Sequence, residues 1–128
     1  MWDFDVAMGN SNYGPSRFVG GSMVSERDWA RRLYRDGAFR AALAARWRQL
    51  SADGLQRRLR ASVRAHARRL VSSGAAGRNF RRWPVLGRHV WPNADGARTR
   101  TSYRSEVTFL VRWLNRRMRW MDSELGRR

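Results

Sequence analysis

Apolar residues recur every three or four positions through most of the chain after residue 25, which is the spacing of helices that bury one face. This pattern predicts five helices, at about residues 25–35, 39–50, 52–73, 75–82 and 102–123. Ser25 and Ser51 are the expected N-caps of the first and third helices, and Gly74 is expected to end the third. In the first helix, Trp29 and Leu33 are predicted to face the core.

The last predicted helix has the broadest apolar surface. Its main stripe is widened by three aromatic residues, Phe109, Trp113 and Trp120. A helix that is apolar around so much of its circumference belongs at the centre of the packing. The Trp and Leu positions of the helical part are therefore expected to be core.

The first six residues alternate apolar and acidic side chains, which is the period-2 pattern of a β-strand. Trp2, Phe4 and Val6 would lie on one face of this strand, and Asp3 and Asp5 on the other. The Gly- and Asn-rich stretch that follows is predicted to be a loop.

The pattern as a whole predicts a mainly α fold and a single domain over residues 1–128. Residues 1–24 would form the strand and loop, and residues 25–128 the helical region.

Composition changes this picture mainly through charge. The formal net charge is +17, and all 27 basic residues are Arg. Such a charge suits nucleic acid, an anionic membrane surface or an acidic partner, but the absence of Lys beside much Ala and Gly is also typical of GC-rich coding. No acidic residue between Asp53 and Asp95 neutralises the middle of the chain. A solvated face is the favoured interpretation of four arginines opposite the leucines of the third helix, Arg57, Arg60, Arg64 and Arg68.

The sequence gives no support for a disulfide-linked protein, a Cys or His metal site, a membrane span or a signal peptide. The chain has no Cys for a disulfide or a thiolate metal site, and His66 and His89 are too far apart for a helical ligand pair. No apolar run approaches the ~20 residues of a membrane span. Asp3 and Asp5 stand where a signal peptide would carry basic residues.

Asp3 and Asp5 are the strongest candidates for chemistry. Two carboxylates at i and i+2 hold like charges close together, which is costly unless a cation neutralises them, and Mg²⁺ takes such oxygen ligands. From spacing alone, the exposed face of an amphipathic strand is the preferred explanation. Asn10 is a weaker candidate ligand, because a Gly-Asn pair is more often only a turn.

An ordered set of motifs resembles the CotH (spore coat protein H) kinase family. The most specific piece is Trp2-Asp3-Phe4-Asp5 followed by Gly9-Asn10, which is similar to the WDFD...GN signature of that family. The remaining similarity, in the same order along the chain, lies in Trp29, Leu33, Phe39, Arg46-Trp47, Leu50, Arg78-Asn79-Phe80, Arg82-Trp83-Pro84, Tyr103, Glu106-Val107, Leu110, Trp113-Leu114, Arg117, Trp120 and Asp122.

The resemblance implies an atypical protein-kinase-like fold, of which this chain would be the helical C-terminal-lobe portion with a short N-terminal strand carrying D-x-D. It implies transfer of the γ-phosphate of ATP to Ser residues of bacterial spore coat or cell-surface proteins. By the same resemblance, Asp3 and Asp5 would bind Mg²⁺ or Mn²⁺ against the ATP phosphates, with Asn10 as a further metal ligand.

Several parts of a kinase do not occur in this sequence. A kinase needs a loop and a Lys over the phosphates and a catalytic Asp near the acceptor hydroxyl. In the family these precede WDFD, and this chain contains no Lys. We therefore expect a C-terminal fragment that is inactive alone, with its upstream half and any export signal elsewhere.

Two alternatives stay open from the sequence. One is a small Arg-rich helical module that binds nucleic acid or another polyanion. The other is a partner-binding remnant that exposes the surface once covered by the missing lobe.

Overall fold

The computed structural model describes residues 6–22 and 28–126, and within these ranges the fold is mainly helical, as predicted, with no strand. Five α-helices follow one another: α1 (Asp28–Arg35), α2 (Gly37–Ala52), α3 (Leu55–Ser72), α4 (Ala75–Arg82) and α5 (Tyr103–Leu125). Short 3₁₀ turns occur at Pro15–Arg17 and Ala97–Thr99. The predicted strand lies outside the described residues except for Val6, which is in a turn.

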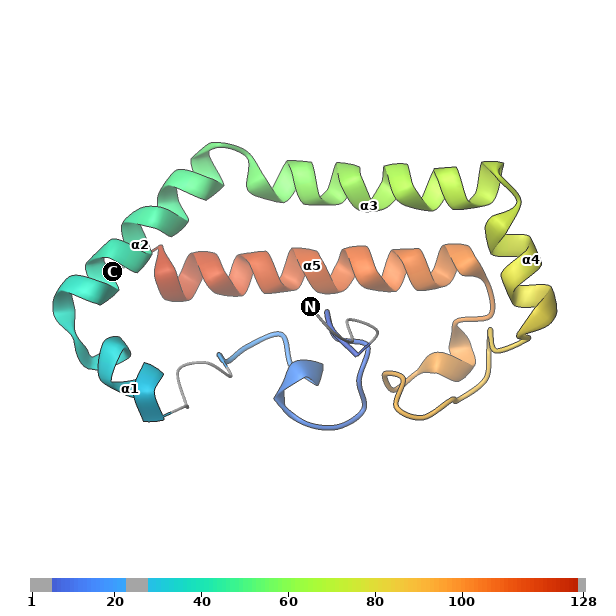
Figure 1. Ribbon diagram of the computed structural model, residues 1–128, viewed down its shortest axis with the longest axis horizontal. Coiled ribbons are helices and arrows are strands. Elements are labelled where there is room, and N and C mark those ends of the chain that lie inside the picture. The colour runs from blue at the N-terminus through green and yellow to red at the C-terminus, as the bar shows by residue number, and fades with distance from the viewer. Residues whose placement is uncertain (1–5, 23–27, 127–128) are drawn as a thin grey trace.

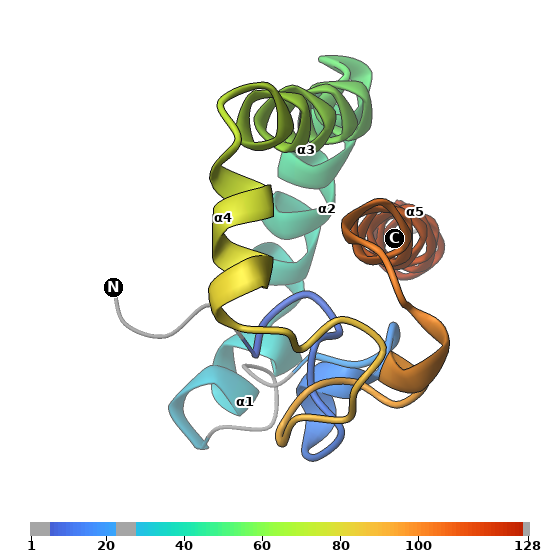
Figure 2. The same cartoon turned by 90° about the vertical axis from the view of Figure 1, so that its right-hand side faces the viewer.

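Helices α2, α3 and α4 form three sides of an open frame, and α5 runs antiparallel to α3 inside it (Figure 1). Viewed along their axes, α3 and α5 are seen end-on, with α2 and α4 to one side (Figure 2). The loops of residues 6–22 and 83–102 lie on the side of α5 that faces away from α3. The central position predicted for the last helix is confirmed, since α5 packs against both α2 and α3.

Local signals in the sequence explain where two of the helices begin. The side chain of Asp36 accepts a hydrogen bond from the backbone N–H of Phe39 and caps α2. Ser102 and Ser105 form a reciprocal capping box at the start of α5. Ser51 is not the N-cap of the third helix as predicted, because α2 continues through it and α3 begins after Gly54 in a left-handed conformation.

The hydrophobic core is small. Its large buried side chains are Trp47 of α2 and Leu114 and Met118 of α5, and the other buried apolar residues are Ala30, Ala44, Ala94 and Ala97. So few enclosed apolar groups leave more of the packing to polar contacts between helices.

The carboxylate of Asp122, near the end of α5, is the main polar contact. Oδ1 accepts a hydrogen bond from Trp47 Nε1 at 3.0 Å and a longer one from Ser51 Oγ at 3.5 Å. Oδ2 accepts one from Gln56 Nε2 of α3 at 2.9 Å. One side chain thereby joins α2, α3 and α5, and it also provides the partner that a buried indole N–H requires.

The inward orientation predicted for α1 is wrong. Trp29 is 68 % exposed and Leu33 is 43 % exposed, whereas Ala30 between them is 1 % exposed. Helix α1 packs against α2, where the ring centroid of Tyr34 lies 5.5 Å from that of Phe39. The large side chains predicted to face inward therefore lie on the exposed side of α1, and the small Ala30 is the residue that is buried.

The solvated face predicted for α3 is correct for three of its four arginines. Arg57, Arg64 and Arg68 are exposed. Arg60 instead donates a hydrogen bond from Nη1 to Asn115 Oδ1 of α5 at 3.1 Å. Its position at the edge of the apolar stripe lets the long side chain reach the neighbouring helix.

We predict that Asp122→Ala lowers the free energy of unfolding by about 3 kcal/mol, because it leaves a buried indole N–H and an amide without their charged acceptor. Asp122→Asn should cost roughly half as much, since one acceptor oxygen remains. Urea denaturation measures both. The control is Asp53→Ala, an exposed carboxylate at the end of α2, which should stay within about 0.5 kcal/mol of the wild type. Equal effects of Asp122→Ala and Asp53→Ala would show that the three-helix contact contributes nothing.

Candidate functional site

Asp3 and Asp5 lie outside the described residues, so the geometry of the candidate site is that of the segment that directly follows them. Residues 6–22 form a loop that lies along one side of α5. The third candidate, Asn10, is in this loop and is partly buried. The contacts that fix this loop determine how rigidly the first described residues after Asp5 are held.

Gly9 brings the loop into direct contact with α5. Its φ of +83° is a conformation that residues with a side chain rarely adopt. A Cβ at this position would lie 2.2 Å from Cδ1 of Trp113, so the indole of Trp113 occupies the space that any side chain would need. The Gly of the Gly9-Asn10 pair is therefore required both by the backbone conformation and by close packing.

Asn10 ties the same loop to the segment before α5. Its Nδ2 donates to Asn93 Oδ1 at 3.2 Å, and its Oδ1 accepts a hydrogen bond from the backbone N–H of Ala94 at 3.4 Å. Two residues further on, the backbone N–H of Asn12 donates to the carbonyl of Pro92 at 3.0 Å. The Gly-Asn pair is thus more than a local turn, since it joins two loops more than 80 residues apart in sequence.

Arg100 holds the second of these loops in place. It is 8 % exposed, and its Nε pairs with Glu106 Oε2 at 2.8 Å. Its Nη1 and Nη2 donate to the carbonyls of Asp95 and Ala94 at 3.0 and 3.3 Å. The guanidinium also stacks over the ring of Phe109, 4.2 Å from its centroid. A buried charge with this many partners is well compensated, and it fixes the backbone that Asn10 binds.

Arg117 of α5 fixes the far end of the N-terminal loop. Its Nη1 donates to the carbonyls of Val19 and Gly21 at 2.6 and 2.7 Å, and its guanidinium lies 4.4 Å from the ring centroid of Trp120. Burial lowers the pKa of Arg117 from its ordinary value. That ordinary value is so high that the side chain stays charged at neutral pH and keeps both hydrogen bonds.

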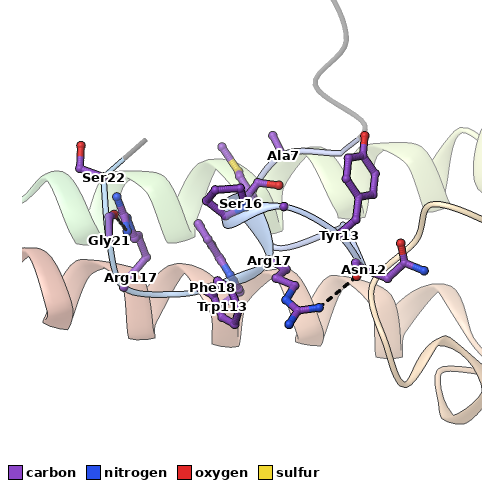
Figure 3. A pocket seen from close by; sticks show the side chains of 14 residues that line it. Ala7, Asn12, Tyr13, Ser16, Arg17, Phe18, Gly21, Ser22, Trp113 and Arg117 are labelled. Atoms are coloured by element: carbon purple, nitrogen blue, oxygen red, sulfur yellow. Dashed lines mark hydrogen bonds between the residues drawn. The ribbon is translucent and has the colours of Figure 1, made fainter. Parts of the chain in front are cut away.

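Two hollows flank the anchored loop. The larger, of about 880 Å³, lies between the loop and α5, and Figure 3 shows Trp113 and Arg117 reaching from the helix toward it. The smaller, of about 530 Å³, is mainly apolar and lies between the loop, α4 and α5, with Asn10, Asn93 and Glu106 among its lining residues. Both hollows include Ala7 and Met8, the residues just after the acidic motif.

The donor chemistry around the loop is compatible with a hard divalent cation. In the part of the chain that the structure describes, no three His, Cys, Asp or Glu side chains gather as a metal cluster. That part does hold two amide oxygens shortly after the motif in sequence, Asn10 Oδ1 and Asn12 Oδ1, and the latter is buried with no hydrogen-bond partner among the described residues. Oxygen donors of this type are the ligands that Mg²⁺ accepts, so the residues present fit such an ion if Asp3 and Asp5 complete the set.

Sequence reasoning missed several residues that build this region. Asn12 and Asn93 were covered only by loop predictions, although Asn in a turn commonly bonds to neighbouring backbone. Arg100 carries no signal in the sequence that separates it from the exposed arginines around it, and only the structure shows its burial.

The family described as CotH kinase protein matches residues 1–121, and the chain therefore belongs to the CotH kinase family. No curated protein and no solved structure matches the chain. None of the helices in the described ranges combines the length and hydropathy of a membrane span.

We predict that Gly9→Ala lowers the free energy of unfolding by about 2 kcal/mol more than Gly21→Ala. Both glycines have a φ of +83°, but none of the residues that the structure describes lies within 4 Å of a Cβ at Gly21. Gly21→Ala should therefore cost only the strain of the backbone, about 1–2 kcal/mol, whereas Gly9→Ala must also displace the indole. Urea denaturation compares the two variants.

The same comparison in a Trp113→Ala background is the control. The excess cost at Gly9 should disappear there, because truncation at Cβ removes the indole atoms that the new Cβ would meet. An excess that persists would mean that contact with Trp113 is not the reason for Gly at this position.

Proposed function

We propose that this chain is the helical, motif-bearing part of a CotH-type protein kinase, which transfers the γ-phosphate of ATP to Ser hydroxyls of protein substrates. Membership of the CotH kinase family implies the use of ATP and of protein substrates. In the transfer, a bond forms between the Ser Oγ and the γ-phosphorus, the bond to the bridging β–γ oxygen breaks, and ADP leaves while the hydroxyl proton passes to a base.

One observation carries the proposal: the loop after the acidic motif is anchored at three places. Gly9 packs on Trp113, Asn10 joins the loop of Ala94, and Arg117 holds the carbonyls of Val19 and Gly21. A metal-binding motif requires ligands held by a rigid support, because positioning of the phosphates supplies much of the catalysis. The family residues Gly9, Asn10, Trp113 and Arg117 would serve as that support.

In this proposal Asp3 and Asp5 bind Mg²⁺ or Mn²⁺, and the ion neutralises charge on the ATP phosphates. Asn10 is the third proposed ligand. Its Oδ1 accepts a hydrogen bond from the backbone N–H of Ala94, and an amide oxygen is a ligand type that Mg²⁺ takes in proteins.

The proposed reaction requires residues that do not occur in this sequence. No Lys is available to contact the phosphates. Exposed large aromatic residues, among them Trp29, Trp83 and Trp91, fit a surface that the remainder of a kinase domain or a partner covers. We therefore expect no phosphotransfer from these 128 residues alone.

In the complete kinase domain, Asp3→Asn and Asp5→Asn should each weaken the binding of Mg²⁺·ATP at least about tenfold, because each removes a charged ligand. Titration calorimetry at fixed Mg²⁺ measures this affinity. The matched control is Asp28→Asn, an exposed carboxylate at the start of α1, which should leave the affinity unchanged. Unchanged affinity in both Asp3→Asn and Asp5→Asn would show that these residues do not bind the metal and would favour the alternative, the exposed face of an amphipathic strand.

A second candidate function is supported by the net charge of +17, which favours binding to nucleic acid or another polyanion. Exposed arginines on α3, such as Arg57, Arg64 and Arg68, face solvent without acidic neighbours on that helix. We predict that any binding to duplex DNA falls steeply with salt and is independent of sequence, because arginine contacts to phosphate release counterions and no base-reading motif is present. Fluorescence anisotropy at several salt concentrations measures both properties. Sequence-selective binding that persists at high salt would promote this function above the kinase role.

A further inference from the structure

The exposed face of α5 carries an unusual row of side chains. The exposed residues from the second residue of the helix onward are Arg104, Thr108, Arg112, Arg116 and Arg119. Their spacing of four, four, four and three positions places them on one line along the helix, about 22 Å long. We call this line the arginine stripe. Figure 2 shows no other helix or loop covering the right-hand side of α5.

The stripe contains no acidic residue, although α5 has three. Glu106 pairs with Arg100, and Asp122 accepts hydrogen bonds from Trp47 and Gln56, so two of these acids act on the inner sides of the helix. Among the residues that the structure describes, no ion pair involves any of the four arginines of the stripe. Arg112 and Arg116, four positions apart, repel each other and weaken the helix slightly.

A solvated helix face normally mixes charges of both signs, and this one does not. The same helix also uses an arginine internally, since Arg117, roughly on its opposite side, holds the N-terminal loop. Arg117 therefore binds the N-terminal loop, whereas the four arginines of the stripe form no ion pair among the described residues.

Two shallow hollows run along the stripe and meet. One, of about 380 Å³, is lined by Arg112, Arg116 and Arg119 together with Phe109, Trp113 and Asn115. The next, of about 500 Å³, includes Arg104, Thr108, Phe109 and Arg112. The two hollows share the lining residues Phe109 and Arg112, and we call them together the groove. Asn115 in the lining accepts a hydrogen bond from Arg60 of α3.

Guanidinium groups in a row suit a ligand with phosphates or carboxylates repeated along an extended chain. A phosphate monoester carries close to two negative charges and accepts paired hydrogen bonds from Arg. We propose that the arginine stripe binds an extended, phosphoserine-bearing segment of a protein. This inference rests on the proposed kinase function, because Ser phosphorylation is the reaction that would produce such a segment.

A single-stranded nucleic acid fits the groove less well, because its bases need exposed aromatic faces on which to stack. The ring of Phe109 is half-buried and is covered by the guanidinium of Arg100 at 4.2 Å. The indole of Trp113 packs against Gly9, and its Nε1 is buried. The groove thus offers charge along its length and no stacking surface.

The test uses the 128-residue chain and a short labelled Ser-Gly peptide with no, one or several phosphoserines, in fluorescence anisotropy near physiological salt. Affinity should rise with each phosphate. The triple variant Arg112→Gln, Arg116→Gln, Arg119→Gln should lose at least about tenfold in affinity for the most phosphorylated peptide. The matched control, Arg32→Gln, Arg35→Gln, Arg40→Gln on α1 and α2, removes the same charge from another exposed part of the chain and should lose less than about threefold.

Three results would overturn the proposal. Equal losses in the two triple variants would mean that only net charge matters, and no loss in either would mean that the stripe does not bind the peptide. Duplex DNA that binds more tightly than the peptide and is weakened selectively by the α5 variant would assign the stripe to nucleic acid. Circular dichroism before each titration confirms that the variants are folded, and Arg→Lys at the same three α5 positions supplies a folded, charge-preserving comparison that should recover only part of the affinity.

The titration contains neither ATP nor metal, so it fails or succeeds independently of the proposed kinase chemistry. If the peptide binds as expected but Asp3→Asn and Asp5→Asn leave the Mg²⁺·ATP affinity unchanged, the proposed metal ligands are wrong and the proposed peptide site stands. If the peptide does not bind but both Asn variants weaken Mg²⁺·ATP binding, the peptide site is wrong and the metal ligands stand.

Discussion

The structure depends on hydrogen bonds to one carboxylate, that of Asp122. Among the described residues only three large apolar side chains are buried, Trp47, Leu114 and Met118, and these cannot by themselves set the angles between the helices. Asp122 of α5 accepts hydrogen bonds from Trp47 and Ser51 of α2 and from Gln56 of α3. Because hydrogen bonds are directional, they restrict the angles between these three helices. Hydrogen bonds to a charged acceptor are stronger than those to a neutral one, so these bonds stabilise the arrangement of the helices more than the same number of neutral hydrogen bonds would.

Helix α5 then positions the candidate site from its other side. Trp113 supports Gly9, and Arg117 holds Val19 and Gly21. Trp47, Trp113, Arg117 and Asp122, which carry the family resemblance in the helices, therefore act mainly as supports. The chemistry of the family would lie in the acidic motif that precedes, in sequence, the loop contacted by Trp113 and Arg117.

Helices could be predicted from the sequence because their signals are local. The predicted fourth helix, residues 75–82, agrees with α4, and Gly74 separates it from α3 as expected. Which face of a helix is buried depends on its neighbours, and the prediction failed for α1, where Trp29 and Leu33 are exposed and Ala30 between them is buried.

The candidate site was less predictable than the helices. Asn10 was recognised as a possible ligand, but its bonds to Asn93 and Ala94 join loops distant in sequence, and no local pattern reports them. Arg100 resembles every other Arg in a chain with 27 of them, and only the fold shows that it is buried. Arg117 belongs to the family pattern, but only the fold shows that it binds the carbonyls of Val19 and Gly21.

Anchoring of the motif-bearing loop is the central claim, and native-state hydrogen exchange tests it most directly. The backbone amides of Asn12 and Ala94 donate to Pro92 and to Asn10 Oδ1, so both should exchange far more slowly than an unstructured chain. In Asn10→Ala, both amides should lose this protection while those of Leu114 and Met118 in α5 keep theirs. Exchange of Asn12 and Ala94 at unstructured rates in the wild type, beside a protected α5, would contradict the account.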